Sequence, residues 1–284
     1  MFLEYLRKRA VRIYPAYWIV FVVVYISAWS FSSLWATVPH DPLAVLKSLA
    51  LIPQDKDVIG GTGAPVLIVA WSLQYEVIFY CAVAAFILNQ YAGSLLCMIA
   101  LPNMVYCQST ACTFPQSFFA SDFLLLFAMG AAVARLCRSQ IQLERPLRVA
   151  LAGASGFALV VILETTCGKD FSVVDRRLLY GFFSAIVIWG AVKAEDNGTL
   201  RVQSRLVSVL GDSSYVLYLV HFPVISALCK LAVLAGLRGV SGAFVVFPVI
   251  VTACVAAAAI IHLRIERPIL VRLAGSDRLR KRGG

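Results

Sequence analysis

Apolar segments recur along the whole chain and are separated by short polar and charged stretches. Most approach the length that a helix needs to cross a bilayer, since about 20 residues at ~1.5 Å each span the hydrocarbon core. The expected spans are Ile13–Ala36, Val66–Leu88, Ser94–Tyr106, Phe118–Leu136, Val149–Thr165, Leu178–Val192, Ser214–Leu234 and Ala243–Leu263. A shorter apolar run, Leu43–Ile52, is expected to lie at the membrane interface. The pattern predicts an all-α, polytopic membrane helix bundle of about eight transmembrane helices.

Composition supports this prediction. Of the 284 residues, 61% are hydrophobic and 14% are charged, and the mean hydropathy is +0.84. Such values are typical of polytopic membrane proteins and exclude an ordinary soluble domain. The apolar runs leave no room for a separate soluble domain. We therefore expect one integral-membrane domain over residues 1–284, in which residues 264–284 form a basic cytoplasmic tail.

The formal net charge of +10 raises the question of a nucleic-acid partner. The basic residues, however, cluster beside the apolar runs, as signals of membrane topology do. If the N-terminus is cytoplasmic, most of the 25 Lys and Arg residues fall in cytoplasmic segments. The charge pattern therefore predicts that both termini are cytoplasmic, with membrane lipids and no nucleic acid as partners.

Cysteine and histidine residues show no metal-binding pattern. The chain holds 8 Cys without any CxxC motif and 3 His without the spacing of metal ligands, so we expect no metal site. Cys107 and Cys112 flank a loop that the predicted topology places outside the cytoplasm. A disulfide between them and two free thiols both remain open at this point.

A carboxylate near the middle of the second long apolar run marks a candidate site. On a helix, Ser72, Glu76 and Tyr80 are four residues apart and share one face, so their polar groups can turn inward together. Glu76 could serve only as structural glue through an interhelical hydrogen bond. We favour a functional site, because ionisable residues within spans are rare and usually functional.

A second polar face lies at the start of the seventh expected span. Ser214, Tyr218 and His221 follow one another at helical spacing, and His221 lies roughly 10 Å into the span. A lone buried histidine is more often a packing residue than a catalyst. Because Glu76 is also within the membrane, we advance a His221–Glu76 pair as a proton-handling unit.

Four motifs in order along the chain carry a family resemblance. They are Arg9-x-x-Arg12-Ile13-Tyr14-Pro15-x-Tyr17-Trp18, Trp71-Ser72-Leu73-x-x-Glu76-x-x-Phe79-Tyr80, Ser214-Tyr215-x-x-Tyr218-Leu219-x-His221-Phe222-Pro223 and Glu266-Arg267-Pro268. Their order and spacing resemble the acyltransferase 3 family, multipass membrane proteins that acylate extracytoplasmic carbohydrates and related acceptors. The resemblance covers essentially the whole chain.

The resemblance implies roles for individual residues. Arg9 and Arg12 lie one helical turn apart at the expected cytoplasmic surface, where they could pair with phosphates of acyl-CoA. They could equally set topology and bind anionic lipid headgroups. The expected site residues are His221 and Glu76 for catalysis, Arg9 and Arg12 for acyl-CoA, and Trp71, Tyr80, Ser214 and Tyr218 for the substrate.

The chain departs from the family pattern at its N-terminus. Relatives usually begin with two additional spans, and the first of these carries an Arg and the His that the family is thought to use as catalytic base. This chain starts at Phe2-Leu3, where the second of those spans would already have ended. We therefore expect either that Met1 is an internal methionine of a longer reading frame or that the chain is a genuine truncation.

The implied function is O-acyl transfer. We expect an acyl group, acetyl in particular, to pass from acyl-CoA to a hydroxyl of a surface carbohydrate such as exopolysaccharide, lipopolysaccharide or a lipid-linked glycan precursor. No bound cofactor is expected, and the expected location is the bacterial inner membrane. Two alternatives stay open: a truncated, non-catalytic relative, and a membrane carrier or flippase. Against a carrier, the sequence shows no internal repeat and no paired Gly/Pro-broken spans.

Reporter fusions test the predicted topology. Fusions after Gln140 and Asn197 should report the cytoplasm, and fusions at Gln54 and Thr110 should report the outside, because basic residues concentrate in cytoplasmic segments. A cytoplasmic result at Thr110 would mean that the number of spans is wrong.

Overall fold

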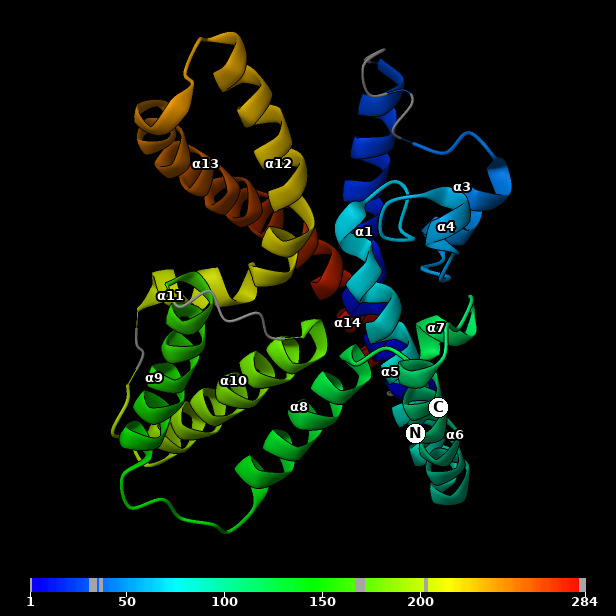
Figure 1. The fold of residues 1–284 in the computed structure, drawn as a ribbon, viewed down its shortest axis with the longest axis vertical. Helices are drawn as coiled ribbons and strands as arrows, with labels where there is room; N and C mark the ends of the chain where they lie inside the picture. Colours follow the sequence, from blue (N-terminus) through cyan, green and yellow to red (C-terminus); the bar gives the residue numbers. More distant parts are fainter. Residues whose placement is uncertain (1, 31–34, 36–37, 167–171, 202–203, 281–284) are drawn as a thin grey trace. The chain divides into compact units, whose positions relative to one another are not determined.

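The chain folds into helices joined by short connections (Figure 1). A computed structural model describes residues 2–30, 35, 38–166, 172–201 and 204–280. Every regular element within those ranges is helical, which confirms the all-α prediction. By length and composition, seven helices in the described ranges could cross a membrane. The chain is therefore an integral, multipass membrane protein.

The helices follow one another with short connections, as the apolar pattern predicts. In chain order they are α1 (Phe2–Ser30), α3 (Pro42–Leu49), α4 (Lys56–Ile59), α5 (Trp71–Leu88), α6 (Gln90–Ser109), α7 (Gln116–Phe119), α8 (Phe123–Arg138), α9 (Pro146–Thr165), α10 (Val173–Asp196), α11 (Arg205–Asp212), α12 (Ser214–Leu234), α13 (Gly239–Ile261) and α14 (Arg267–Arg280). A 3₁₀ turn, η1 (Ile68–Ala70), precedes α5, and a π-helical turn, η2 (His262–Glu266), joins α13 to α14.

The expected spans correspond closely to these helices. The span Ser214–Leu234 coincides with α12, and the interfacial run Leu43–Ile52 contains most of α3. The span Ser94–Tyr106 lies in α6, which is long enough to cross but is not among the seven candidates, because polar residues lower its hydropathy. The end of the first expected span, at Ala36, and residues 281–284 of the expected tail lie outside the described residues.

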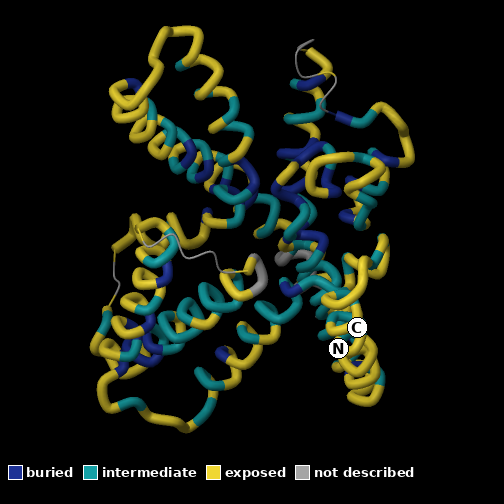
Figure 2. The backbone as a smooth tube through the Cα atoms, in the orientation of Figure 1, coloured by how far each residue is buried: buried dark blue, intermediate teal, exposed yellow. Residues whose placement is uncertain are grey.

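The chain divides into two compact units. Unit 1 comprises Met1–Leu96 and Ser204–Gly284, and unit 2 comprises Cys97–Gln203. Within each unit, many large apolar side chains are exposed. Figure 2 shows long exposed segments of the backbone in both units. In a membrane protein such surfaces face lipid. The expectation of one membrane domain over the whole chain stays a prediction.

The core of unit 1 is formed where α1, α5 and α12 pack together. On α1, Ile13, Tyr17 and Phe21 repeat at intervals of four residues, so one face of the helix is buried. Val216 and Leu219 of α12 are also fully buried in this core. The three helices that carry the first three sequence motifs are therefore held side by side.

Three aromatic side chains of α1 bind the C-terminal end of α3. Tyr17 Oη donates a hydrogen bond to the Ser48 carbonyl (2.6 Å), Trp18 Nε1 donates to the Leu49 carbonyl (2.9 Å), and Tyr14 Oη donates to the Ala50 carbonyl (3.0 Å). The last carbonyl groups of a helix have no partner within the helix, so these donors satisfy them. The aromatic part of the first motif therefore fixes α3 against α1.

Ion pairs connect the helices of unit 2. Arg177 of α10 contacts Asp122 before α8 at 2.7 Å, and its neighbour Arg176 contacts Glu164 of α9 at 3.1 Å. Tyr180, one turn further along α10, donates a hydrogen bond to Glu164. Because each carboxylate is paired with a cation, these acidic side chains are tolerated near the membrane.

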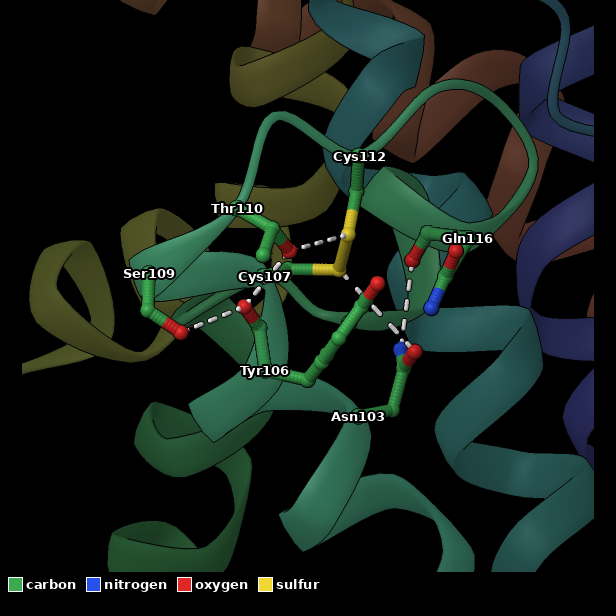
Figure 3. Close-up of a disulfide and its surroundings, with 7 residues drawn as sticks. All are labelled: Asn103, Tyr106, Cys107, Ser109, Thr110, Cys112 and Gln116. Atoms are coloured by element: carbon green, nitrogen blue, oxygen red, sulfur yellow. Dashed lines mark hydrogen bonds between the residues drawn. A yellow bond between two sulfur atoms is a disulfide. The ribbon is translucent and has the colours of Figure 1, made fainter.

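A disulfide closes the connection between α6 and α7 (Figure 3). Cys107 and Cys112 are bonded, which resolves the alternative that the sequence left open. Beside the bond, the Asn103 side chain donates to the Gln116 carbonyl at 3.2 Å. Disulfides form in oxidising compartments, so the bond agrees with the predicted location of this loop outside the cytoplasm.

The closest helix packing in unit 2 depends on glycine. A Cβ atom at Gly190 of α10 would lie 2.4 Å from the backbone nitrogen of Ala150 in α9, and one at Gly153 would lie 2.8 Å from the nitrogen of Val187. Membrane helices often approach closely at small residues, where backbones can come into contact. No larger residue fits these two positions without separating α9 from α10.

Replacing Gly190 tests this packing. Gly190→Ala should lower the melting temperature of the detergent-purified protein, because overpacking costs about 1–3 kcal/mol. Gly130→Ala in α8 is the matched control, since no atom lies within 4 Å of a Cβ at that position. Equal melting temperatures for the two variants would contradict the close α9–α10 contact.

Candidate functional site

Residues of all four sequence motifs lie in unit 1, on helices that pack against one another. The first motif is on α1, the second on α5 and the third on α12, while the fourth begins at the end of η2 and continues into α14. Packing of α1 against α5, α12 and α14 brings these elements together (Figure 1). Every predicted site residue is therefore part of one compact unit.

Glu76 lies at the centre of a polar cluster between α5 and α1. It accepts a hydrogen bond from Tyr80, one turn further along α5, as the four-residue spacing predicts. The Tyr80 ring lies 6.3 Å from the Tyr5 ring in an edge-on arrangement. The guanidinium carbon of Arg9 lies 4.9 Å from the Tyr80 ring centre and 5.2 Å from that of Tyr5. Arg9 is thus held by two aromatic faces.

This arrangement leaves the hydrogen-bonding edge of Arg9 available. A cation–π contact uses the face of the guanidinium group, whereas its N–H donors point outward in the plane. Arg12, one turn further along α1, is exposed. Among the described residues, neither arginine forms an ion pair with a carboxylate. Both can therefore donate to an anionic ligand.

Ser72 and Tyr218 join α5 to α12. Their hydroxyl oxygens are 2.5 Å apart, and Tyr218 also donates to the carbonyl of Val69 at 2.7 Å. Val69 lies in η1, whose 3₁₀ geometry leads directly into α5. The second and third motifs thus meet through two hydroxyl groups.

His221 is oriented by its own helix. Its Nδ1 lies 2.6 Å from the carbonyl oxygen of Tyr218, one turn earlier on α12. A carbonyl oxygen only accepts hydrogen bonds, so Nδ1 carries the hydrogen and the neutral ring keeps its lone pair on Nε2. Such an imidazole can accept a proton through Nε2.

The structure gives Glu76 and His221 different partners. Glu76 accepts a hydrogen bond from Tyr80 on its own helix, whereas His221 contacts the carbonyl of Tyr218 on α12. Among the described residues, no ion pair joins Glu76 to His221. The His221–Glu76 pair inferred from the sequence stays a prediction, because depth along the chain does not set how α5 and α12 are aligned.

The remaining predicted residues occupy the ends of helices. Trp71 is the first residue of α5, and its ring lies edge-on to Tyr75 with 6.2 Å between ring centres. Ser214 is the first residue of α12 and is exposed, whereas its neighbour Ser213 is buried. Ser214 thus lies apart from the Ser72–Tyr218 contact.

Sequence reasoning missed a polar cluster at the end of α13. His262 Nδ1 lies 2.5 Å from Glu266 Oε2, and both side chains are buried. Tyr215, which was quoted only as part of a motif, donates to the Ile13 carbonyl at 2.8 Å. The four-residue spacing of His262 and Glu266 was the available signal. Within the described ranges, no group of three His, Cys, Asp or Glu residues could hold a metal ion.

The contacts predict which side chains are energetically coupled. Glu76→Gln combined with Tyr80→Phe should cost less stability than the sum of the single changes, with an interaction free energy of about 0.5–3 kcal/mol. Glu76→Gln combined with His221→Ala should be additive, because the two side chains have different partners. Thermal unfolding in detergent measures both pairs of substitutions. Additive losses for Glu76 and Tyr80, together with non-additive losses for Glu76 and His221, would contradict this arrangement.

Comparison with known proteins agrees with these motifs. A family model described as an acyltransferase domain matches residues 1–263. The chain is 28% identical over 283 residues to the exopolysaccharide production protein ExoZ of Rhizobium meliloti (strain 1021), covering 95% of this chain and 81% of that protein. No solved structure matches the chain. Because the family model covers nearly the whole sequence, the chain belongs to the acyltransferase 3 family of membrane proteins.

Proposed function

We propose that this acyltransferase moves an acetyl group from cytoplasmic acetyl-CoA to a hydroxyl group of a surface carbohydrate. The observation that carries the proposal is that the arginines and the histidine of the site lie at different places along the packed helices α1, α5 and α12. Arg9 and Arg12 lie near the start of α1, and the oriented imidazole of His221 lies further along α12. An anion-binding end and a proton-accepting group are what transfer from a CoA thioester to a hydroxyl needs.

Arg9 and Arg12 bind the phosphate groups of the donor. Charge-assisted hydrogen bonds between guanidinium and phosphate are strong, and both arginines retain free donors. Tyr80 and Tyr5 hold Arg9 in place, and Glu76 orients the hydroxyl of Tyr80. In this proposal the Glu76 carboxylate acts through Tyr80 on the donor end of the site.

His221 accepts the proton of the acceptor hydroxyl through Nε2. The hydroxyl oxygen attacks the thioester carbonyl, the carbon–sulfur bond breaks, and the departing CoA thiolate takes the proton from His221. The Tyr218 ring lies 5.7 Å from the His221 ring. The hydroxyl groups of Ser72 and Tyr218 each carry one hydrogen, so the group that stabilises the oxyanion exchanges its present hydrogen bond for one to that oxygen. Trp71 and Ser214, at the ends of α5 and α12, contribute to substrate binding.

The acceptor is a carbohydrate, such as an exopolysaccharide subunit or a lipid-linked glycan. The relative ExoZ is named as an exopolysaccharide production protein, and the match spans 95% of this chain. In this proposal the protein lies in the bacterial inner membrane, where cytoplasmic acetyl-CoA and a surface glycan are both within reach, with the donor end of α1 toward the cytoplasm.

Donor binding tests the role of the two arginines. Arg9→Ala and Arg12→Ala should each weaken CoA binding to the purified protein by about 1.5–3 kcal/mol, because each removes a charge-assisted contact. Lys8→Ala is the matched control, since Lys8 lies on the same helix but pairs with Glu4 at 3.2 Å. Unchanged affinity in both arginine variants would leave them with a role in topology only.

Transfer kinetics test the role of His221. His221→Gln should lower the rate of acetyl transfer roughly 100- to 10,000-fold, because it removes the proton acceptor. Donor affinity should stay at the wild-type value. His40→Gln, in the connection before α3, is the matched control. A His221→Gln enzyme that transfers acetyl groups at the wild-type rate would exclude His221 as the base.

A further inference from the structure

The pair formed by His262 and Glu266 has no part in the transfer chemistry described above. The exposed fractions of these residues are 8% and 5%, and Nδ1 of His262 lies 2.5 Å from Oε2 of Glu266. Removing an imidazole and a carboxylate from water is costly, and breaking such a pair leaves a buried polar group without its partner. A buried pair of this kind therefore calls for a specific role.

The local sequence explains how the pair forms. Pro268 has no backbone N–H, so it cannot complete the regular helical hydrogen bond to the residue four positions earlier. The helix widens just before the proline, and the N–H of Arg267 donates to the carbonyl of His262, five residues earlier. This π-helical turn directs His262 and Glu266 inward, whereas Ile265 between them is exposed. Single π-helical turns occur frequently at functional sites.

Two routes connect this pair to the donor end of α1. The first runs through the core of unit 1, where Ile261, next to His262, and Tyr215 pack against the buried cluster that contains Ile13. Tyr215 also donates to the carbonyl of Ile13, the residue after Arg12. The second is the backbone itself, because α14 starts directly after Glu266 and packs against α1. The first route ends beside Arg12, and the second reaches α1, the helix that carries Arg9 and Arg12.

We propose that His262 and Glu266 are positioning residues for the donor: their pair fixes the η2 turn and Tyr215 so that α1 presents Arg9 and Arg12 to the phosphates of acyl-CoA. This inference rests on the proposed function for the identity of the ligand. The pair acts through Tyr215 and α14 and touches neither the acceptor nor the acetyl group. Its loss therefore weakens donor binding and leaves the transfer step intact.

Three measurements on the detergent-purified full chain test this proposal. Hydrogen exchange of the backbone amides from Arg9 to Ile13 reports the order of α1 whether or not the donor binds. Titration with acetyl-CoA gives the dissociation constant, and steady-state kinetics give kcat and the acceptor KM. The variants are Glu266→Ala, the conservative His262→Asn, which keeps an N–H donor near the place of Nδ1, and the control Ile265→Ala on the outer side of the same turn.

Glu266→Ala should speed exchange in this segment and raise the dissociation constant of acetyl-CoA roughly 3- to 30-fold, the range expected for coupling through a packed network. The acceptor KM and kcat at saturating donor should not change. His262→Asn and Ile265→Ala should behave like the wild type. Tyr215→Phe should reproduce the effect of Glu266→Ala, and the two changes together should be less than additive because they interrupt the same route.

Other outcomes separate this proposal from the proposed function. If the backbone amides from Arg9 to Ile13 exchange at the wild-type rate in Glu266→Ala, the pair has no positioning role. The proposal is also overturned if the dissociation constant of acetyl-CoA and the acceptor KM rise equally, because an equal rise indicates general destabilisation. If the wild-type protein binds no acetyl-CoA, the proposed function fails. In that case the hydrogen-exchange measurement still decides whether the pair orders α1. If Glu266→Ala does not fold, Glu266→Gln, which keeps the shape of the side chain, replaces it.

Discussion

A polar side chain within a bilayer must find its partner in the protein, because no water is available there. This constraint organises the site of unit 1. Glu76 is bound by Tyr80, Ser72 by Tyr218, and His262 by Glu266. Each contact satisfies a group that would otherwise be costly to bury, and the first two also fix side chains that the proposed chemistry uses. The same requirement pairs Glu164 and Asp122 with arginines in unit 2.

The exception to this rule is informative. Among the described residues, Arg9 and Arg12 form no ion pair with a carboxylate, and Arg9 is held instead by the faces of two tyrosine rings. Aromatic faces orient a guanidinium group without occupying its donors. An arginine held in this way is prepared for an anionic ligand at little cost in side-chain order. A carboxylate partner would have had to be displaced before a phosphate could bind.

The sequence predicted the helices and the shared faces of single helices, but not the contacts between helices. The spacing of Ser72, Glu76 and Tyr80 placed them on one face, and the Glu76–Tyr80 bond confirms this. The His221–Glu76 pair had no such basis, because it depends on how α5 and α12 are aligned, and packing of the core decides that. The hydrogen bond from Tyr215 to the Ile13 carbonyl was overlooked for the same reason, because it joins α12 to α1. The His262–Glu266 pair lies within one helical stretch and was readable from its spacing.

The proposed function requires that this site transfer an acetyl group and not carry a substrate across the membrane. Proteoliposomes with radiolabelled acetyl-CoA on the cytoplasmic side and an unlabelled oligosaccharide on the other test it most directly. Label should appear on the oligosaccharide as an ester that mild base releases, with free CoA remaining on the donor side. Label that stays on CoA, or intact acetyl-CoA or oligosaccharide that crosses the membrane, would exclude acetyl transfer at this site.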